Sequence, residues 1–195
     1  MSNPVIESLR RLAQDLTAID AAWALIGGFA VSARAEPRFT RDVDVCVAVA
    51  DDGAAEQIAR ALVDRGYVVA SIIEHEERRR LSTVRLVSPV PGGVVVDLLF
   101  ASSGIEPELV ESAEPLELLP GVVAPVARAA HLVVLKLLAR DDQSRPQDAA
   151  DLVALRPRLT VADEGEVQRL AALVMERGYH RDRDLIGLAA AYLAR

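Results

Sequence analysis

The sequence predicts an α+β fold, in which a small mixed β-sheet with flanking helices is followed by a mainly helical C-terminal part. Two observations predict it. Apolar and alternating stretches of strand length fill much of residues 1–104, and segments of helix length fill the chain beyond residue 128. Strands that precede a run of helices are typical of an α+β protein or of two packed units. We expect a core unit over residues 1–104 and a helical domain over residues 105–195, packed on the active-site cleft.

The first unit is expected to open with a helix. Asn3-Pro4 suits a helix cap and first turn, and apolar residues then recur every three or four positions up to Ile19. A Gly-Gly turn at 27–28 precedes a short helix that ends before Pro37. The other expected elements are extended segments at 22–26, from 42 to the break at 51, 67–73, 81–88 and 94–100, and a helix over 53–65.

Proline and glycine mark the connection between the two units. They punctuate the chain from residue 102 to residue 125, which leaves room for two short extended pieces at 116–119 and 122–126. Beyond these pieces the apolar pattern is helical. The expected helices cover residues 128–140, 146–157, 163–177 and 182–194.

The composition limits the classes of function. The formal net charge is −7, so the chain is unlike a protein that grips nucleic acid by bulk electrostatics, although a local basic cleft is compatible with this charge. No apolar run reaches the length of a membrane span, and the charged N-terminal pattern is unlike a signal peptide. The one cysteine, Cys46, excludes an internal disulfide and fits a reducing cytoplasm, where we expect the protein to act.

Two acids open an apolar strand. In the segment Asp-Val-Asp, Asp42 and Asp44 share one face of an extended strand, whereas Val43 points into the core. Neighbouring carboxylates repel each other unless a cation lies between them, and Mg²⁺ prefers such oxygen ligands together with substrate phosphates. Gly27 and Gly28 let the backbone approach a phosphate closely. The pattern therefore predicts a site for Mg²⁺ (or Mn²⁺) and a phosphate substrate.

Two further charged residues lie inside apolar stretches. Asp97 stands in the middle of VVVDLLF, where a carboxylate is costly unless it is paired, hydrogen-bonded or metal-bound. Lys136 is the single lysine among 22 basic residues and lies within HLVVLKLLA. An ammonium there suits a point charge on a phosphate; the alternative is a side chain that reaches to the surface. If the strands are neighbours, Asp42, Asp44 and Asp97 converge on one cleft, as two-metal phosphoryl transfer requires.

This combination resembles the polymerase-β-like nucleotidyltransferase superfamily, whose pattern is a Gly-Gly or Gly-Ser turn, a spacer, Asp-x-Asp and a later third acid. The residues that match are Gly27, Gly28, Asp42, Asp44 and Asp97, with thirteen residues between the glycines and the first acid. The resemblance implies transfer of a nucleoside monophosphate from an NTP to an acceptor hydroxyl. It also implies that the three acids hold the divalent metal and that Asp97 serves as, or orients, the general base.

Within that superfamily the chain is similar to the AbiEii-type nucleotidyltransferases, a group that includes toxins of toxin–antitoxin systems. The motifs that carry the similarity are RFTRDVD at 38–44 and HLVVLKLLAR…RPQDAADL at 131–152. In that group a helical lysine and a following Arg-x-x-Asp element complete the site. The similarity therefore implies site roles for Lys136, Arg145 and Asp148, with Asp151 as a further candidate, and it raises the expectation of an antitoxin partner.

Groups beside the glycine turn are expected to hold the NTP. The turn itself offers backbone N–H groups to the phosphates, and Arg38, Arg41 or Lys136 neutralises their negative oxygens. Thr40 either donates to a phosphate or orders the loop that precedes the acids.

Three functions are open at this point. The first is an active nucleotidyltransferase, a toxin or a housekeeping enzyme, that modifies RNA such as tRNA, a protein or a small molecule. The second is a nucleotide- or partner-binding module of the same fold without turnover, against which the three intact acids argue. The third is an aminoglycoside-like small-molecule nucleotidyltransferase, because an acidic chain is compatible with a cationic acceptor.

Overall fold

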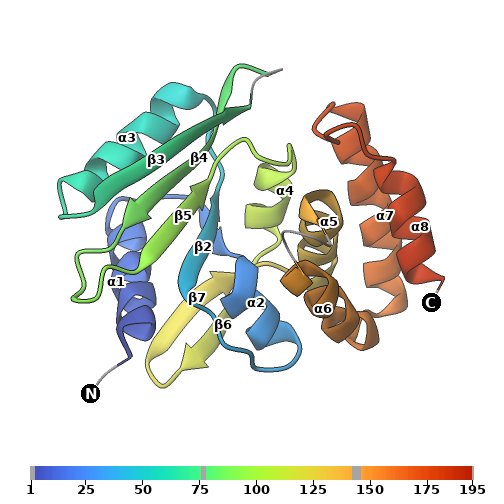
Figure 1. The fold of residues 1–195 in the computed structure, drawn as a ribbon, viewed down its shortest axis with the longest axis horizontal. Coiled ribbons are helices and arrows are strands. Elements are labelled where there is room, and N and C mark those ends of the chain that lie inside the picture. Colours follow the sequence, from blue (N-terminus) through green and yellow to red (C-terminus); the bar gives the residue numbers. More distant parts are fainter. Residues whose placement is uncertain (1–2, 76–77, 142–145, 195) are drawn as a thin grey trace.

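A computed structural model describes residues 3–75, 78–141 and 146–194. The strands are β1 (Trp23–Leu25), β2 (Asp42–Val47), β3 (Val68–His75), β4 (Arg80–Val87), β5 (Val95–Leu99), β6 (Glu114–Leu119) and β7 (Val122–Val126). Within the described residues they form one seven-stranded sheet in the order β3-β4-β5-β2-β1-β7-β6 (Figure 1). β2 is parallel to β5 and β1 is parallel to β7, whereas the other neighbours are antiparallel, so the sheet is mixed.

The helices surround the sheet and extend beyond it. They are α1 (Pro4–Ala18), α2 (Gly27–Arg34), α3 (Asp52–Val63), α4 (Glu106–Glu111), α5 (Ala129–Ala139), α6 (Pro146–Leu155), α7 (Val161–Glu176) and α8 (Leu185–Leu193), with a 3-10 turn at Arg156–Arg158. α1 and α4 pack against β2, and α3 packs against β4. Figure 1 shows α5 to α8 gathered on one side of the molecule, away from β3 and β4. The expected α+β fold with a later group of helices is therefore confirmed.

The central strand β2 follows the alternation that the sequence predicts. Val43, Val45 and Val47 are fully buried in the core, whereas Asp42 and Asp44 stay partly accessible. Cys46 is buried as well, and burial raises the pKa of its thiol well above the ordinary value. The apolar side chains therefore fix the register of β2, and that register places its carboxylates on the opposite face.

The sheet continues beyond the position where we expect the first unit to end. β6 and β7 form a hairpin, and β7 is hydrogen-bonded to β1. Arg34, at the end of α2, holds this hairpin, because its guanidinium donates to the carbonyls of Val126 (2.9 Å) and Ala127 (3.0 Å) and to Glu114 Oε2 (2.6 Å). The division between residues 104 and 105 stays a prediction, but the hydrogen bonds join residues 114–126 to the sheet.

The helical part is built around α5. This helix is buried along most of its length, including Leu132, Val133 and Leu137, and contacts α6, α7 and α8 on the helical side. It also contacts α2, the short helix that follows the glycine turn. α5 is thus the element that brings residues after 128 next to the Asp-bearing strand.

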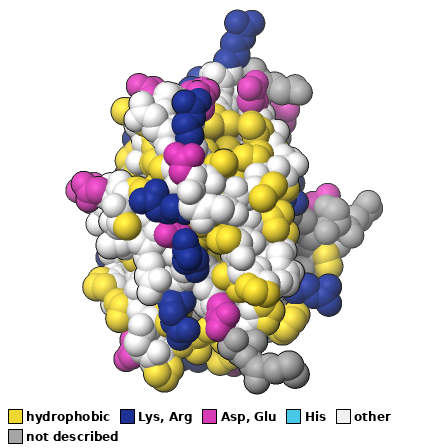
Figure 2. Space-filling model, turned by 90° about the vertical axis from the view of Figure 1, so that its left-hand side faces the viewer, with side chains coloured by type: hydrophobic (Ala, Val, Ile, Leu, Met, Phe, Trp, Pro, Cys, Tyr) yellow, Lys and Arg dark blue, Asp and Glu magenta, His cyan; other side chains and the backbone are white. Residues whose placement is uncertain are grey.

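The opposite edge of the sheet is apolar and exposed. On β3 the side chains of Val68 and Ile72 are 63% and 60% exposed, and Val69 and Ile73 are also exposed. Figure 2 faces the side of the molecule that carries α3 and β3 in Figure 1, and shows hydrophobic side chains interspersed with basic and acidic ones.

Among the described residues, no helix is long and apolar enough to cross a membrane.

Candidate active site

Three neighbouring strands place two acids and an arginine in one row. In the parallel pairing of β2 with β5, Asp44 lies opposite Asp97. In the antiparallel pairing of β5 with β4, Asp97 lies opposite Arg85. Asp42 stands two residues before Asp44 and shares its face of the sheet. We call Asp42, Asp44, Asp97 and Arg85 the acid row; the structure brings together the three acids that the sequence singles out.

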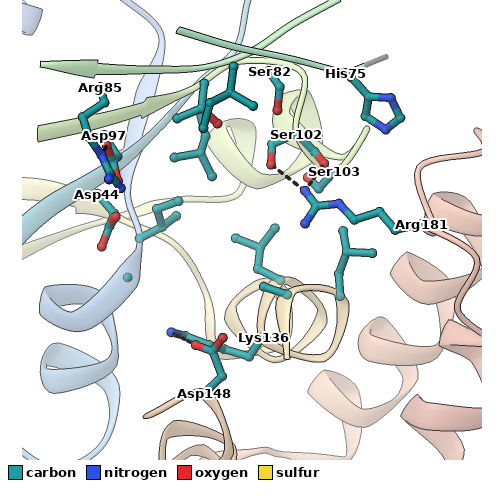
Figure 3. A pocket seen from close by; sticks show the side chains of 18 of the residues that line it. Asp44, His75, Ser82, Arg85, Asp97, Ser102, Ser103, Lys136, Asp148 and Arg181 are labelled. Atoms are coloured by element: carbon teal, nitrogen blue, oxygen red, sulfur yellow. Dashed lines mark hydrogen bonds and ion pairs between the residues drawn. The ribbon is translucent and has the colours of Figure 1, made fainter. Parts of the chain in front are cut away.

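Arg85 holds the third acid of the row with both arms of its guanidinium. Nε donates to Asp97 Oδ1 (2.8 Å) and Nη2 donates to Asp97 Oδ2 (2.7 Å), which is the two-point geometry that makes such pairs strong. The bonds to Asp97 raise the pKa of Arg85, and the more distant charges of Asp42 and Asp44 raise it further. Arg85 therefore lies within the field of all three carboxylates, and Figure 3 shows it beside Asp97 and Asp44.

The glycine turn touches the row from the β1 side. Gly27 has φ +62°, and a Cβ atom at this residue would stand 1.9 Å from Asp44 Oδ2. A Cβ atom at Gly28 would stand 2.7 Å from Thr40 Oγ1 and 3.0 Å from Arg38 Nη2. Both positions therefore need glycine, because the backbone passes too close to these groups for any side chain.

The same turn begins a helix at the edge of the pocket. Ile26 is the N-cap residue of α2, and within the described part of the chain no side chain caps the helix there. The N-terminus of a helix carries partial positive charge and N–H donors that suit an anion such as phosphate. Gly27 and Gly28 thus combine a close approach to Asp44 and Thr40 with a place in the first turn of a helix.

The loop before β2 fixes the first acid. Thr40 Oγ1 donates to Asp42 Oδ1 (2.9 Å), so this hydroxyl orders the carboxylate that follows it. Arg41 lies over the ring of Phe39, with 5.8 Å between its Cζ atom and the ring centroid, and Phe39 is 73% exposed. The proposed phosphate contacts of Thr40 and Arg41 stay predictions.

A second charged cluster joins α5, α6 and the loop before β2. Lys136 Nζ lies 2.6 Å from Asp148 Oδ1 and 2.9 Å from Asp151 Oδ2. On the other side of Asp151, Arg38 Nε lies 2.7 Å from Oδ1, and Arg38 Nη2 donates to Oδ2 (2.9 Å). We call these four residues the buried clamp, because the Asp148 and Asp151 side chains are 8% and 1% exposed and Lys136 is 15% exposed.

The buried clamp changes the interpretation of two expected phosphate contacts. The sequence predicts that Lys136 and Arg38 neutralise phosphate oxygens, but in this structure both cations contact Asp151. Lys136 still lines the same pocket as Asp44 and Asp97, and so does Asp148. Arg145, the remaining candidate of that motif, lies outside the described residues.

A pocket of about 490 Å³ connects these groups. One end holds Gly27 with Asp44, Asp97 and Arg85 of the acid row, and Lys136 with Asp148 forms part of the wall (Figure 3). The middle of the pocket is apolar, with Leu99, Leu132, Leu135 and Leu138 among its lining residues. The far end is polar, and its lining residues include His75, Ser82, Ser102, Ser103 and Arg181.

The carboxylates fit a hard divalent cation by their chemistry. Asp42, Asp44 and Asp97 offer oxygen ligands from one face of the sheet, and a cationic group, Arg85, already lies against them. As the side chains stand, no group of three or more Asp, Glu, His or Cys residues in 3–75, 78–141 and 146–194 forms a metal-binding cluster. The Asp97 carboxylate is turned towards Arg85 instead.

The comparisons with known proteins agree with this geometry. The sequence matches the family described as nucleotidyl transferase AbiEii toxin, type IV toxin–antitoxin system, over residues 10–193. The chain belongs to the AbiEii family. This family membership makes the protein a nucleotidyltransferase, as the glycine turn and the acids predict. No curated protein matches the sequence.

Solved structures show the same fold at low sequence identity. This AbiEii-family chain is similar to an antigenic nucleotidyltransferase-like protein from Paracoccidioides brasiliensis, with a TM-score of 0.53 and 20% identity over 97% of this chain and 94% of that chain. It is also similar to ANT(2'')-Ia, solved in complex with adenylyl-2''-tobramycin, with a TM-score of 0.50 and 14% identity over 97% of this chain and 95% of that chain. At these identities the similarity shows a common fold.

The sequence analysis did not single out several residues that line the pocket. Arg85 is the most important of them, and its signal was a charged residue inside the apolar strand pattern LSTVRLV. His75 is partly buried, lines the pocket and packs edge-on against Tyr179 with 5.0 Å between ring centroids. Arg181 comes from the segment between α7 and α8, and no motif in the sequence marks it.

Proposed function

We propose that the protein transfers a nucleoside monophosphate from an NTP to an acceptor hydroxyl at the acid row, with a divalent cation, Mg²⁺ or Mn²⁺, held by Asp42, Asp44 and Asp97. One observation carries the proposal. The direct pairing of Asp44 with Asp97 puts acids from two strands side by side, next to a glycine turn that approaches Asp44. Carboxylates beside phosphate-binding N–H groups are the arrangement that phosphoryl transfer uses.

The triphosphate is proposed to lie at the N-terminus of α2. The N–H groups of the first turn, which includes Gly27 and Gly28, are the proposed donors to the phosphate oxygens. A divalent cation at the three carboxylates supplies charge neutralisation for the phosphate oxygens and the departing pyrophosphate. The nucleoside then extends into the pocket, along the apolar wall that α5 contributes.

The acceptor is proposed to approach from the β4 side of the row, because the glycine turn occupies the β1 side. Asp97, the acid nearest β4, takes or directs the proton of the acceptor hydroxyl. The acceptor oxygen forms a bond with the α-phosphorus while the bond from that phosphorus to the bridging oxygen breaks. The electron pair leaves with pyrophosphate, so charge and atoms balance.

The acceptor itself is proposed to be anionic, with RNA as the first candidate and a protein or a small molecule as the alternatives. Arg85 and Arg181 line the pocket outside the buried clamp, and guanidinium groups suit phosphate oxygens as hydrogen-bond acceptors. We extend the toxin role and an antitoxin partner to this chain as proposals from the family, and we place its action in the cytoplasm, where NTPs and RNA are present. ANT(2'')-Ia makes an aminoglycoside the class to test against.

The test is label transfer from each α-³²P-NTP in the presence of Mg²⁺. Wild-type protein, Asp44→Asn and Asp64→Asn are incubated in parallel with total RNA, total protein and tobramycin. Asp64 is an exposed acid at the end of α3, so its variant is the matched control. We expect label in one acceptor fraction with wild type and Asp64→Asn, and a loss of about 100-fold or more with Asp44→Asn. Equal transfer by Asp44→Asn and wild type would contradict the proposed site.

A further inference from the structure

Arg85 covers the carboxylate of Asp97, which the proposed function needs as an accessible metal ligand. Both oxygens of Asp97 accept a hydrogen bond from its guanidinium. The Asp97 side chain is only 10% exposed, so little of the carboxylate faces solvent beyond this pair. A divalent cation at Asp97 would stand next to the positive charge of Arg85, and the two cations repel each other. The closed pair and metal binding at Asp97 therefore oppose each other.

Arg85 is free to move in a way that the lysine of the buried clamp is not. The Arg85 side chain is 47% exposed, and its hydrogen bonds in the structure go to a single carboxylate. Lys136 is 15% exposed and contacts two buried carboxylates. An arginine with half of its surface in solvent can leave its partner at low cost, because water replaces the lost hydrogen bonds.

We propose that Arg85 is an internal counter-ion of the acid row, which the divalent cation displaces from Asp97 during loading. This inference rests on the proposed function, since it assumes that a cation binds at the three acids. Arg85 stands on the β4 side of Asp97, opposite the glycine turn. Once displaced, its guanidinium faces the proposed acceptor side and frees an Asp97 oxygen for the acceptor's proton. Arg85 thus acts as a positioning residue that sets cation affinity through Asp97.

The first test measures Mn²⁺ binding without any nucleotide, by electron paramagnetic resonance of free Mn²⁺. We compare wild type with Arg85→Gln, Arg85→Lys and Arg80→Gln. Arg80 is the matched control, because it lies on the same strand and pairs with Asp52 away from the row (2.7 Å). We expect Arg85→Gln to bind Mn²⁺ about three- to tenfold more tightly, Arg85→Lys to lie between it and wild type, and Arg80→Gln to match wild type.

If Arg85 had only a structural role, its removal would not tighten Mn²⁺ binding. The Asp97 carboxylate without its arginine would be less ordered and would bind Mn²⁺ no better. Equal or weaker binding by folded Arg85→Gln therefore overturns the inference. Asp44→Asn is titrated in the same series. If wild type binds Mn²⁺, Asp44→Asn weakens the binding and Arg85→Gln leaves it unchanged, the counter-ion inference fails and the proposed function survives. If wild type binds no Mn²⁺, the proposed metal site itself fails.

A second test is read out on wild-type protein, and a variant is used only to assign the signal. The Nε–Hε resonance of Arg85, assigned by its absence in Arg85→Lys, reports on the hydrogen bond to Asp97. We expect saturating Mg²⁺ to shift this resonance and to increase the exchange of its proton with water, because the bond to Asp97 opens. An unchanged resonance at saturating Mg²⁺ would contradict displacement.

Discussion

The acid row and the buried clamp contribute to the same pocket, yet they satisfy their charges in different ways. In the clamp, two cations face two carboxylates, and the carboxylates are almost completely buried. In the row, a half-exposed guanidinium pairs with Asp97, and the charges of Asp42 and Asp44 act on it from farther away. The clamp is therefore neutral by formal charge, whereas the four side chains of the row carry a formal charge of −2.

This difference indicates which cluster is structural and which one exchanges its partner. A buried ion pair cannot lose one member without leaving a charge in a low-dielectric environment, so the clamp is expected to stay closed. An exposed arginine can be replaced by another cation, so the row is expected to open. The predictions below test this contrast, beginning with the largest expected change in stability.

Breaking the clamp should cost the most stability. Asp151→Asn removes the carboxylate that Lys136 and Arg38 share, and we expect a loss of about 3 kcal/mol or more in the free energy of unfolding. The loss should be the same with and without Mn²⁺, measured by urea denaturation. Asp64→Asn is the control and should change stability by less than about 0.5 kcal/mol. A loss below about 1 kcal/mol for Asp151→Asn would show that the clamp is not a structural unit.

Lowering the pH should destabilise the protein through His131, which lies on α5. Burial lowers the pKa of His131 on α5 from 6.5 to about 4, so the unfolded chain takes up this proton at a higher pH than the folded protein. Stability is thus complete above pH 6.5 and falls as the pH decreases towards 4, by about 3 kcal/mol at most. Urea denaturation across this range should show the slope in wild type and a smaller slope in His131→Gln. Identical slopes would contradict a buried neutral imidazole.

Crowding the glycine turn at Gly28 should have an intermediate effect. In Gly28→Ala the new Cβ atom would stand 2.7 Å from Thr40 Oγ1, which holds Asp42. We expect a loss of about 1–2 kcal/mol in stability and about tenfold in NTP affinity, measured by urea denaturation and by calorimetric titration. Gly165→Ala is the matched control, because a Cβ atom there meets nothing within 4 Å, and it should stabilise α7 slightly. If Gly28→Ala and Gly165→Ala had the same stability and the same NTP affinity, there would be no close contact at Gly28 that excludes a side chain.

Removing Arg85 should cost the least stability. In metal-free buffer we expect Arg85→Gln to lose about 0.5–1 kcal/mol, because the pair with Asp97 is half exposed. Saturating Mn²⁺ should cancel this loss, since the cation takes over the neutralisation of the acids. Melting curves with and without Mn²⁺ provide the measurement. A loss as large as that of Asp151→Asn, and insensitive to Mn²⁺, would place Arg85 among the structural ion pairs.

The sequence predicted the local part of this contrast. Alternation along β2 was enough to place Val43 in the core and its flanking acids on the other face, and a lone acid in an apolar strand was enough to single out Asp97. Gly27 was predicted to let the backbone approach a phosphate, which stays a prediction; its φ of +62° and the closeness of Asp44 explain why a glycine stands there. These features depend on neighbours within a few residues, and for that reason the pattern could show them.

The non-local part could not be predicted. Arg85 faces Asp97 only because β4 pairs with β5 in one register, and a shift by one residue would turn Arg85 to the other face. The pairing of Arg38 with Asp151 joins residues 113 positions apart. The sequence predicted β6 and β7 as short extended pieces, but not as strands of the sheet, because each contains a proline. In the structure Pro115 and Pro125 lie opposite each other in the β6–β7 pair. Register and long-range pairing thus account for most of what was missed.

The most direct measurement of the central claim is pyrophosphate release from an NTP by Asp42→Asn, Asp44→Asn and Asp97→Asn, each compared with wild type and Asp64→Asn. Each of the three variants replaces one carboxylate oxygen by an amide nitrogen, and circular dichroism serves to check that each variant is folded. The account predicts that each loses about 100-fold or more in rate while Asp64→Asn keeps the wild-type rate. A folded Asp44→Asn or Asp97→Asn that releases pyrophosphate at the wild-type rate would contradict it.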